Sequence, residues 1–68
     1  MLFIKNIISK LRYEHKITQQ ELADITGVSR QTIISLETGK YNPSITLAHK
    51  ISRYFGKSIE DVFIFEEE

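Results

Sequence analysis

The sequence contains no cysteine, so the chain can form neither a disulfide nor a thiolate-ligated zinc site. No stretch approaches the roughly 20 consecutive apolar residues that a membrane-spanning helix needs, and no signal peptide is recognisable. The chain is also short, at 68 residues, which fits a single domain spanning 1–68. We therefore expect a cytoplasmic protein that has no contact with a membrane.

Residues for catalysis or metal binding are sparse as well. His15 and His49 stand far apart without a carboxylate cluster beside them, and no serine has a histidine–aspartate partnership. The sequence lacks a glycine-rich phosphate loop, and so short a chain leaves little room for a pocket. We predict no enzymatic activity, no metal, no cofactor and no small-molecule ligand.

The charge is zero in total but unevenly distributed. Residues 1–57 contain all nine Lys and Arg against four acidic residues, which gives 9 − 4 = +5. Residues 58–68 contain five acidic and no basic residues, which gives −5. Such asymmetry between segments points to a polyanionic partner more strongly than the total charge does, although an ordinary solvated surface could also produce it.

Apolar residues at helical spacing predict the first helix. Ile4, Ile7, Ile8 and Leu11 follow the i, i+3, i+4, i+7 pattern of one amphipathic face. The start of this helix is ambiguous, because residues 2–4 could equally be extended.

Capping signals place two helices directly after the first. Thr18 and Glu21 form a capping box that begins a helix, and Gly27 ends it by supplying a left-handed conformation. Only Val28 separates that glycine from Ser29, the N-cap of the next helix. The resulting turn of about three or four residues is the spacing of a helix-turn-helix, over residues 19–38.

Similar signals organise the rest of the chain. Gly39 closes the third helix, and Ser44 caps a fourth helix that Gly56 ends. Ser58 opens a short fifth helix. The tail at 62–68 is β-branched and aromatic, so it is either helical or a strand. A strand there would pair most readily with residues 2–4, giving a short two-stranded ribbon.

The first turns of the third helix are polar where the later positions are apolar. Arg30, Gln31, Thr32 and Ser35 offer donors and acceptors, whereas Ile33 and Leu36 supply an inner face. The major groove of DNA admits one helix and presents a different hydrogen-bonding pattern for each base pair, with Arg suited to guanine and Gln to adenine. We predict that these four polar residues face DNA bases.

The stretch TQQELADITGVSRQTIISLETGKYNPS resembles the DNA-binding domain of Cro and phage repressors, the XRE-like regulators. The resemblance covers about residues 6–63 and is greatest to small stand-alone repressors of a single domain. It implies an all-α fold of the five-helix, lambda-repressor type, to which the termini could add the β-ribbon. It also implies a transcriptional regulator of bacteria or phages.

The same resemblance implies roles for individual residues. Gln19 would bind a phosphate and buttress Arg30, while Arg12 and Glu37 would form a structural ion pair. The remaining phosphate contacts would come from Ser29, Thr38, Lys40, Tyr41 and Asn42. The sequence departs from the family pattern at Ile34, commonly polar, at Thr38, commonly asparagine, and at Lys16, commonly glycine.

The tail indicates self-association. Small domains without disulfides often gain stability by forming oligomers, and residues 58–68 carry Phe63, Ile64 and Phe65, which we expect at a homodimer interface. We expect a dimeric repressor that binds double-stranded DNA at a near-palindromic operator. The alternative is an antitoxin or another partner-binding module that uses the same domain.

Overall fold

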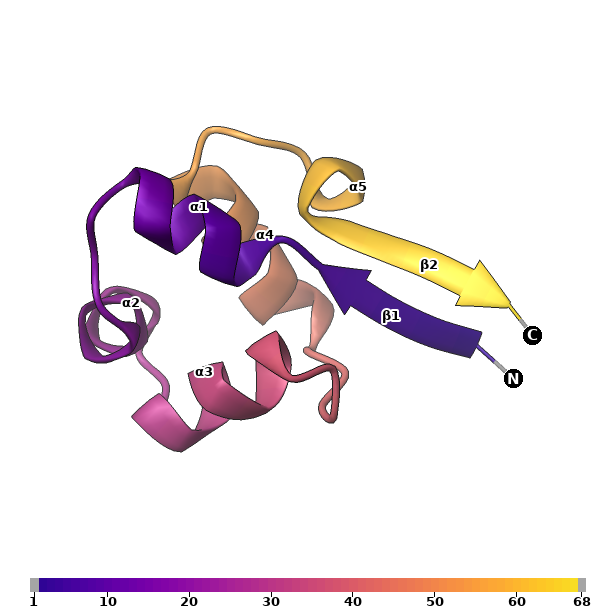
Figure 1. The fold of residues 1–68 in the computed structure, drawn as a ribbon, viewed down its shortest axis with the longest axis horizontal. Helices are drawn as coiled ribbons and strands as arrows, with labels where there is room; N and C mark the ends of the chain where they lie inside the picture. The colour runs from indigo at the N-terminus through magenta and orange to yellow at the C-terminus, as the bar shows by residue number, and fades with distance from the viewer. Residues whose placement is uncertain (1, 68) are drawn as a thin grey trace.

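The computed structural model describes the backbone of residues 2–67 and the side chains of residues 5–64. Five helices follow a first strand and precede a second one (Figure 1). In chain order the elements are β1 (Leu2–Asn6), α1 (Ile8–Glu14), α2 (Gln19–Thr26), α3 (Arg30–Glu37), α4 (Ile45–Tyr54), α5 (Ile59–Val62) and β2 (Phe63–Glu67). The expected five-helix fold with a terminal ribbon is confirmed.

Side-chain caps begin four of the five helices. At α2, the Thr18 hydroxyl accepts from the Glu21 amide at 3.0 Å, and the Glu21 carboxylate accepts from the Thr18 amide at 2.9 Å. Ser29, Ser44 and Ser58 accept from the backbone three residues later in the same way. Each cap satisfies an amide that would otherwise lack a partner, which is why the sequence signals were reliable here.

One core joins all five helices and the start of β2. Its apolar members are each at most 6% exposed. They are Ile8, Leu11, Leu22, Ala23, Ile33, Leu36, Leu47, Ala48, Ile51, Phe55, Val62 and Phe63. The apolar side of the fourth helix, with Leu47, Ala48 and Ile51, therefore faces inward.

The first helix begins later than its apolar spacing suggested. Ile4 belongs to β1 and α1 starts at Ile8, so the i, i+3 match between Ile4 and Ile7 is a coincidence of spacing. The extended alternative for residues 2–4 is the correct one. Pairing with β2 satisfies the backbone here, and that partner lies at the opposite end of the sequence.

The two strands form an antiparallel ribbon at one end of the molecule (Figure 1). Leu2 lies opposite Glu67, and Asn6 lies opposite Phe63. The pairing continues past the strands, because the Ile7 amide donates to the Val62 carbonyl at 3.0 Å. The N-terminal segment is thereby fixed against the end of α5.

Four helices are followed by a left-handed residue, which is glycine after α2, α3 and α4 and Lys16 after α1. Gly27 after α2 has φ 77°, and Lys16 after α1 has φ 57°. At the turn after α1, the Ile17 amide donates to the Arg12 carbonyl and the Lys16 amide to the Tyr13 carbonyl, both at 3.1 Å. This is the Schellman arrangement that usually contains glycine, so Lys16 replaces that glycine without changing the turn.

Within residues 2–67, no helix is long and apolar enough to cross a membrane.

Candidate nucleic-acid interface

Helices α2 and α3 cross closely through small and branched apolar residues. Ala23 of α2 and Ile33 of α3 are fully buried, as are Leu22 and Leu36 beside them. Gly27 makes the turn between the helices, and the Val28 amide donates to the Ala23 carbonyl at 3.1 Å. The packing turns the opposite face of α3 outward.

The first turn of α3 is capped by Ser29, and its next two side chains make no hydrogen bond to the described part of the domain. The Ser29 hydroxyl accepts from the Thr32 amide at 3.1 Å and shares a hydrogen bond of 2.9 Å with the Thr32 hydroxyl. Arg30 and Gln31 are exposed and make no side-chain hydrogen bond within the described part of the chain. These two side chains are therefore free to meet a ligand.

The next positions of α3 are partly covered. Ser35 and Ile34 are both half-buried, and Thr32 has its hydroxyl turned towards Ser29. Of the four predicted base-facing residues, Arg30 and Gln31 thus extend outward without constraint. Thr32 and Ser35 would present only short hydroxyl groups.

The last turn of α3 is a second Schellman arrangement. The Lys40 amide donates to the Ser35 carbonyl and the Gly39 amide to the Leu36 carbonyl, both at 3.1 Å. The Thr38 hydroxyl donates to the Ser35 carbonyl at 3.0 Å. Thr38 thus contributes to the helix end and is exposed at the same time.

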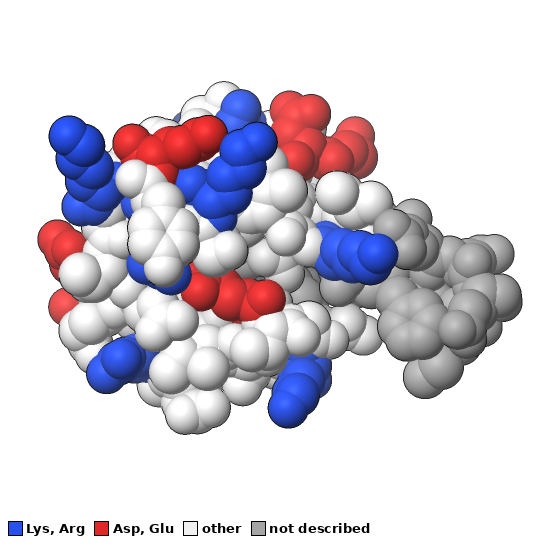
Figure 2. All heavy atoms as spheres, viewed as in Figure 1, with Lys and Arg blue, Asp and Glu red and all other residues white. Residues whose placement is uncertain are grey.

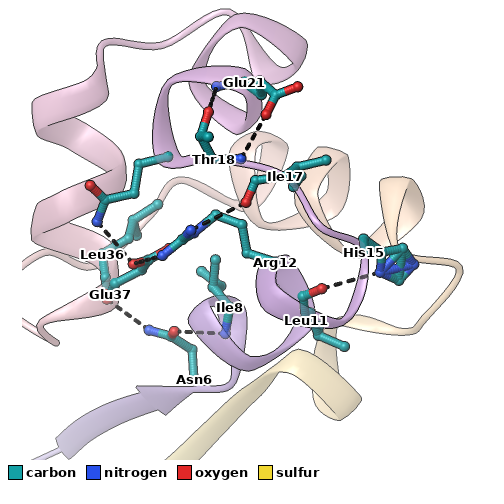
Figure 3. Close-up of polar contacts among 11 residues, drawn as sticks. Asn6, Ile8, Leu11, Arg12, His15, Ile17, Thr18, Glu21, Leu36 and Glu37 are labelled. Atoms are coloured by element: carbon teal, nitrogen blue, oxygen red, sulfur yellow. Dashed lines mark hydrogen bonds and ion pairs between the residues drawn. The ribbon is translucent and has the colours of Figure 1, made fainter.

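A buried ion pair ties this end of α3 to α1 (Figure 3). Arg12 donates from Nε to Glu37 Oε2 at 2.8 Å and from Nη2 to Oε1 at 3.1 Å. It donates a third hydrogen bond to the Ile17 carbonyl at 3.2 Å. The bonds to Glu37 raise the pKa of Arg12 above its ordinary value, although desolvation by burial opposes the shift.

Gln19 joins this cluster. Its amide donates to Glu37 Oε1 at 3.1 Å, and no hydrogen bond to Arg30 is present among the described residues. The expected buttress for Arg30 is therefore replaced by a contact that helps to hold Glu37. Gln19 and Arg30 still line the same open hollow at the start of α2, together with Tyr13, Lys16 and Gln20.

Asn6 is a contributor that the sequence analysis missed. Its Nδ2 donates to the Leu36 carbonyl at 2.7 Å, and its Oδ1 accepts from the Ile8 amide at 3.1 Å (Figure 3). An asparagine just before an apolar helical pattern is a common helix-start signal, which could have placed the start of α1 correctly. Its contact with a residue thirty positions away leaves no such signal.

The loop after α3 presents polar side chains beside the helix. Lys40 and Asn42 are exposed, and Tyr41 is exposed to 44%. With Gln19 and Ser29 at the helix starts, the predicted phosphate contacts lie at both ends of α3. A duplex seated on α3 would meet them on either side.

Charge of both signs is spread over the visible face of the molecule. Figure 2 shows acidic side chains over α5, over α1, at the α2 edge and in the centre, and basic side chains near both ends of α3 and over α1. The helical acids Glu60 and Asp61 are in the first turn of α5, where the helix dipole favours them.

His15 has structural surroundings. His15 Nδ1 lies 3.1 Å from the Leu11 carbonyl, and its ring packs edge-on against Phe55 at 4.9 Å. Among the described residues, no group of three or more His, Cys, Asp or Glu could hold a metal ion.

Two capped helices joined by a short turn, with the second presenting free polar side chains, define a helix-turn-helix DNA-binding domain. Residues 8–62 match the family model described as helix-turn-helix, so the chain belongs to that family. It is therefore a transcriptional regulator of the XRE-like class and not an enzyme.

Similar proteins occur in archaea and bacteria. An HTH-type transcriptional regulator of Methanocaldococcus jannaschii is 52% identical over 65 residues, covering 96% of this chain and 98% of that protein. The cryptic phage CTXphi transcriptional repressor RstR of Vibrio cholerae is 29% identical over 81% of this chain and half of its own length. The crystal structure of the transcriptional regulator VanUg matches this structure with a TM-score of 0.78 and 24% sequence identity. The match covers 98% of this chain and 89% of that one. The likeness to VanUg concerns the fold.

Proposed function

We propose that this regulator binds double-stranded DNA sequence-specifically by inserting the first turns of α3 into the major groove. Arg30, Gln31, Thr32 and Ser35 face the bases. The observation that carries the proposal is the contrast within α3: its inner face and its C-terminal end are tied to the domain, whereas Arg30 and Gln31 at its start are exposed and unengaged.

Phosphate contacts on both sides of α3 would fix its position in the groove. The proposed set is Gln19, Ser29, Thr38, Lys40, Tyr41 and Asn42. Ser29 can cap α3 and donate a hydrogen bond to a DNA phosphate at the same time, because a hydroxyl can accept from one group and donate to another. The Gln19 amide has two protons, so it can contact Glu37 with one and a phosphate with the other.

The regulator acts as a homodimer in this proposal. Two α3 helices related by a twofold axis enter successive major grooves roughly 34 Å apart, so the operator is a near-palindrome. Two large apolar side chains support a contact surface: Ile64 of β2 is 44% exposed and Ile45 at the start of α4 is 79% exposed.

The expected contribution of Phe63 to that surface needs correction. Its side chain is only 2% exposed and belongs to the core of its own domain, so it is not available to a second subunit. The alternation of a strand turns Phe63 inward and its neighbour Ile64 outward. The side chain of Phe65 lies outside the described residues.

Repression follows from occupation of promoter DNA. The name of the phage repressor RstR supports this direction of regulation.

The test begins with selection of bound fragments from a random DNA pool, which yields the site, its symmetry and its spacing. Gln31→Ala should then cost about 1–3 kcal/mol on the selected site and relax the preference at one base position. Affinity for an unrelated duplex of equal length is the control. An equal loss on both duplexes would exclude a base-reading role for Gln31.

A further inference from the structure

Asn6 lies where the terminal ribbon meets the helices. It is the last residue of β1, opposite Phe63 of β2, and the next amide along the chain, that of Ile7, donates to the Val62 carbonyl. The backbone of Asn6 is thus held by pairing of the two ends of the chain. Its side chain begins from a point that the ribbon determines.

That side chain makes two bonds of different kinds. Oδ1 accepts from the Ile8 amide at the start of α1, and Nδ2 donates to the Leu36 carbonyl in the last turn of α3. The same carbonyl accepts the Gly39 amide at 3.1 Å, so both of its lone pairs are used. Only a side chain with an acceptor and a donor on one planar group can form both bonds in this geometry.

The bond to Leu36 connects the ribbon to the DNA-facing helix. At 2.7 Å it is short for an N–H···O bond, and it acts on the end of α3 that Arg12 also holds through Glu37. Helix α3 has eight residues and is about 12 Å long, so a tilt at its last turn also alters the position of its first turn. A small displacement at Leu36 therefore changes the direction in which Arg30 and Gln31 extend.

We infer that Asn6 is a positioning residue that couples pairing of the chain termini to DNA recognition by α3. The inference rests on the proposed function, in which α3 binds the DNA major groove. The ribbon then serves as more than an edge of the fold: when β1 and β2 are paired in register, Asn6 reaches Leu36 and α3 is aligned for the major groove.

A local role at the start of α1, through the Ile8 amide, would explain only one of the two bonds. Asn6→Asp separates the roles, because aspartate keeps the acceptor for the Ile8 amide and loses the donor to Leu36. A carboxylate also repels the Leu36 carbonyl. Asn6→Ala removes both bonds without adding a charge, and it is the matched variant.

The experiment measures, for the full chain, the ratio of affinity for the selected operator to affinity for an unrelated duplex of equal length. Both variants should lower this ratio about fivefold, as expected for loss of one net hydrogen bond. The added charge of Asn6→Asp weakens binding to all DNA alike, so it cancels in the ratio. Amide hydrogen exchange of Gly39, which shares the Leu36 carbonyl, should be faster in both variants.

An unchanged ratio in folded Asn6→Asp would overturn the inference, and so would unchanged Gly39 exchange. A lower affinity ratio in Asn6→Ala but not in Asn6→Asp would also overturn the inference, because that result would assign Asn6 a role only at the start of α1. A wild-type chain that shows no preference for any duplex would instead defeat the proposed function. Exchange at Gly39 would then decide by itself whether the ribbon acts on α3.

Discussion

Lys16 occupies a backbone position that suits glycine. Its φ of 57° is left-handed, a conformation that costs a residue with a Cβ roughly 1–2 kcal/mol. Lys16→Gly should raise the free energy of unfolding by about 1 kcal/mol, after part of the gain is offset by the greater freedom of glycine in the unfolded chain.

Urea denaturation measures the effect, with Lys16→Ala as the control that removes the same side chain but keeps the Cβ. Equal stabilities for the glycine and alanine variants would show that the backbone conformation carries no strain.

Lys40 is the residue at which the phosphate contacts can be tested most directly. It is exposed in the loop after α3, whereas Lys50 is exposed on α4 and lines a different hollow with Ile25 and Tyr54. Lys40→Ala should weaken binding to all duplexes and reduce the slope of log affinity against log salt by about one unit.

Lys50→Ala removes the same charge and should leave that slope unchanged. Similar slopes for the two variants would mean that net charge, and not a phosphate contact at Lys40, accounts for the effect. Fluorescence anisotropy over a range of salt concentrations provides the measurement.

At the scale of elements, the ion pair of Arg12 and Glu37 fastens α1 to α3. Both side chains are less than one-tenth exposed, so removing one partner leaves a buried charge without compensation. Glu37→Ala should lower the free energy of unfolding by about 3 kcal/mol. The double variant Arg12→Met, Glu37→Leu should recover most of this loss, because it removes both charges.

Urea denaturation of Glu37→Ala and of the double variant provides the measurement. A double variant no more stable than Glu37→Ala would show that packing, not the unpaired charge, causes the loss. Because pairing raises the pKa of Arg12, the contribution of its charge is complete below its unfolded pKa and is lost only as the pH rises through the raised value. Alkaline titration up to about pH 10 should therefore leave the pair intact.

Local signals explain why most elements could be predicted. The caps at Thr18, Ser29, Ser44 and Ser58 are chemistry between residues three positions apart, and they begin helices wherever the sequence indicated. The start of α1 depends on strand pairing with the other end of the chain, so its apolar spacing was misleading.

The candidate interface likewise has parts that could be predicted from the sequence and parts that could not. The exposed first turn of α3 followed from its polar sequence, and the partnership of Arg12 with Glu37 followed from the family resemblance. The contact of Asn6 with α3 could not be found, since its partner is the Leu36 carbonyl, a backbone group that every residue possesses. The engagement of Gln19 with Glu37 in place of Arg30 depends on the side-chain geometry of the folded cluster.

For the whole molecule, three exposed isoleucines allow a comparison of surfaces. Ile45→Glu and Ile64→Glu should each shift the sedimenting mass from dimer to monomer, because a buried charge at the proposed contact surface is costly. Ile25 of α2 is 48% exposed and is not part of the proposed contact surface, so Ile25→Glu should leave the mass unchanged.

Sedimentation at several protein concentrations provides the measurement. Dissociation by Ile25→Glu alone would move the contact surface to α2, and a wild-type monomer at all concentrations would exclude the dimer. Monomeric variants should also lose cooperative binding to the two halves of a near-palindromic site.

The antiparallel register brings Leu2 and Glu67 opposite each other, so the two ends of the described backbone lie side by side (Figure 1). A few added residues would suffice to join the ends into a ring, or to fuse two copies in tandem, without stretching any element. Conversely, a purification tag at either end meets the same ribbon. Tag placement therefore offers no neutral end, and the tag should be removed before DNA affinity is compared.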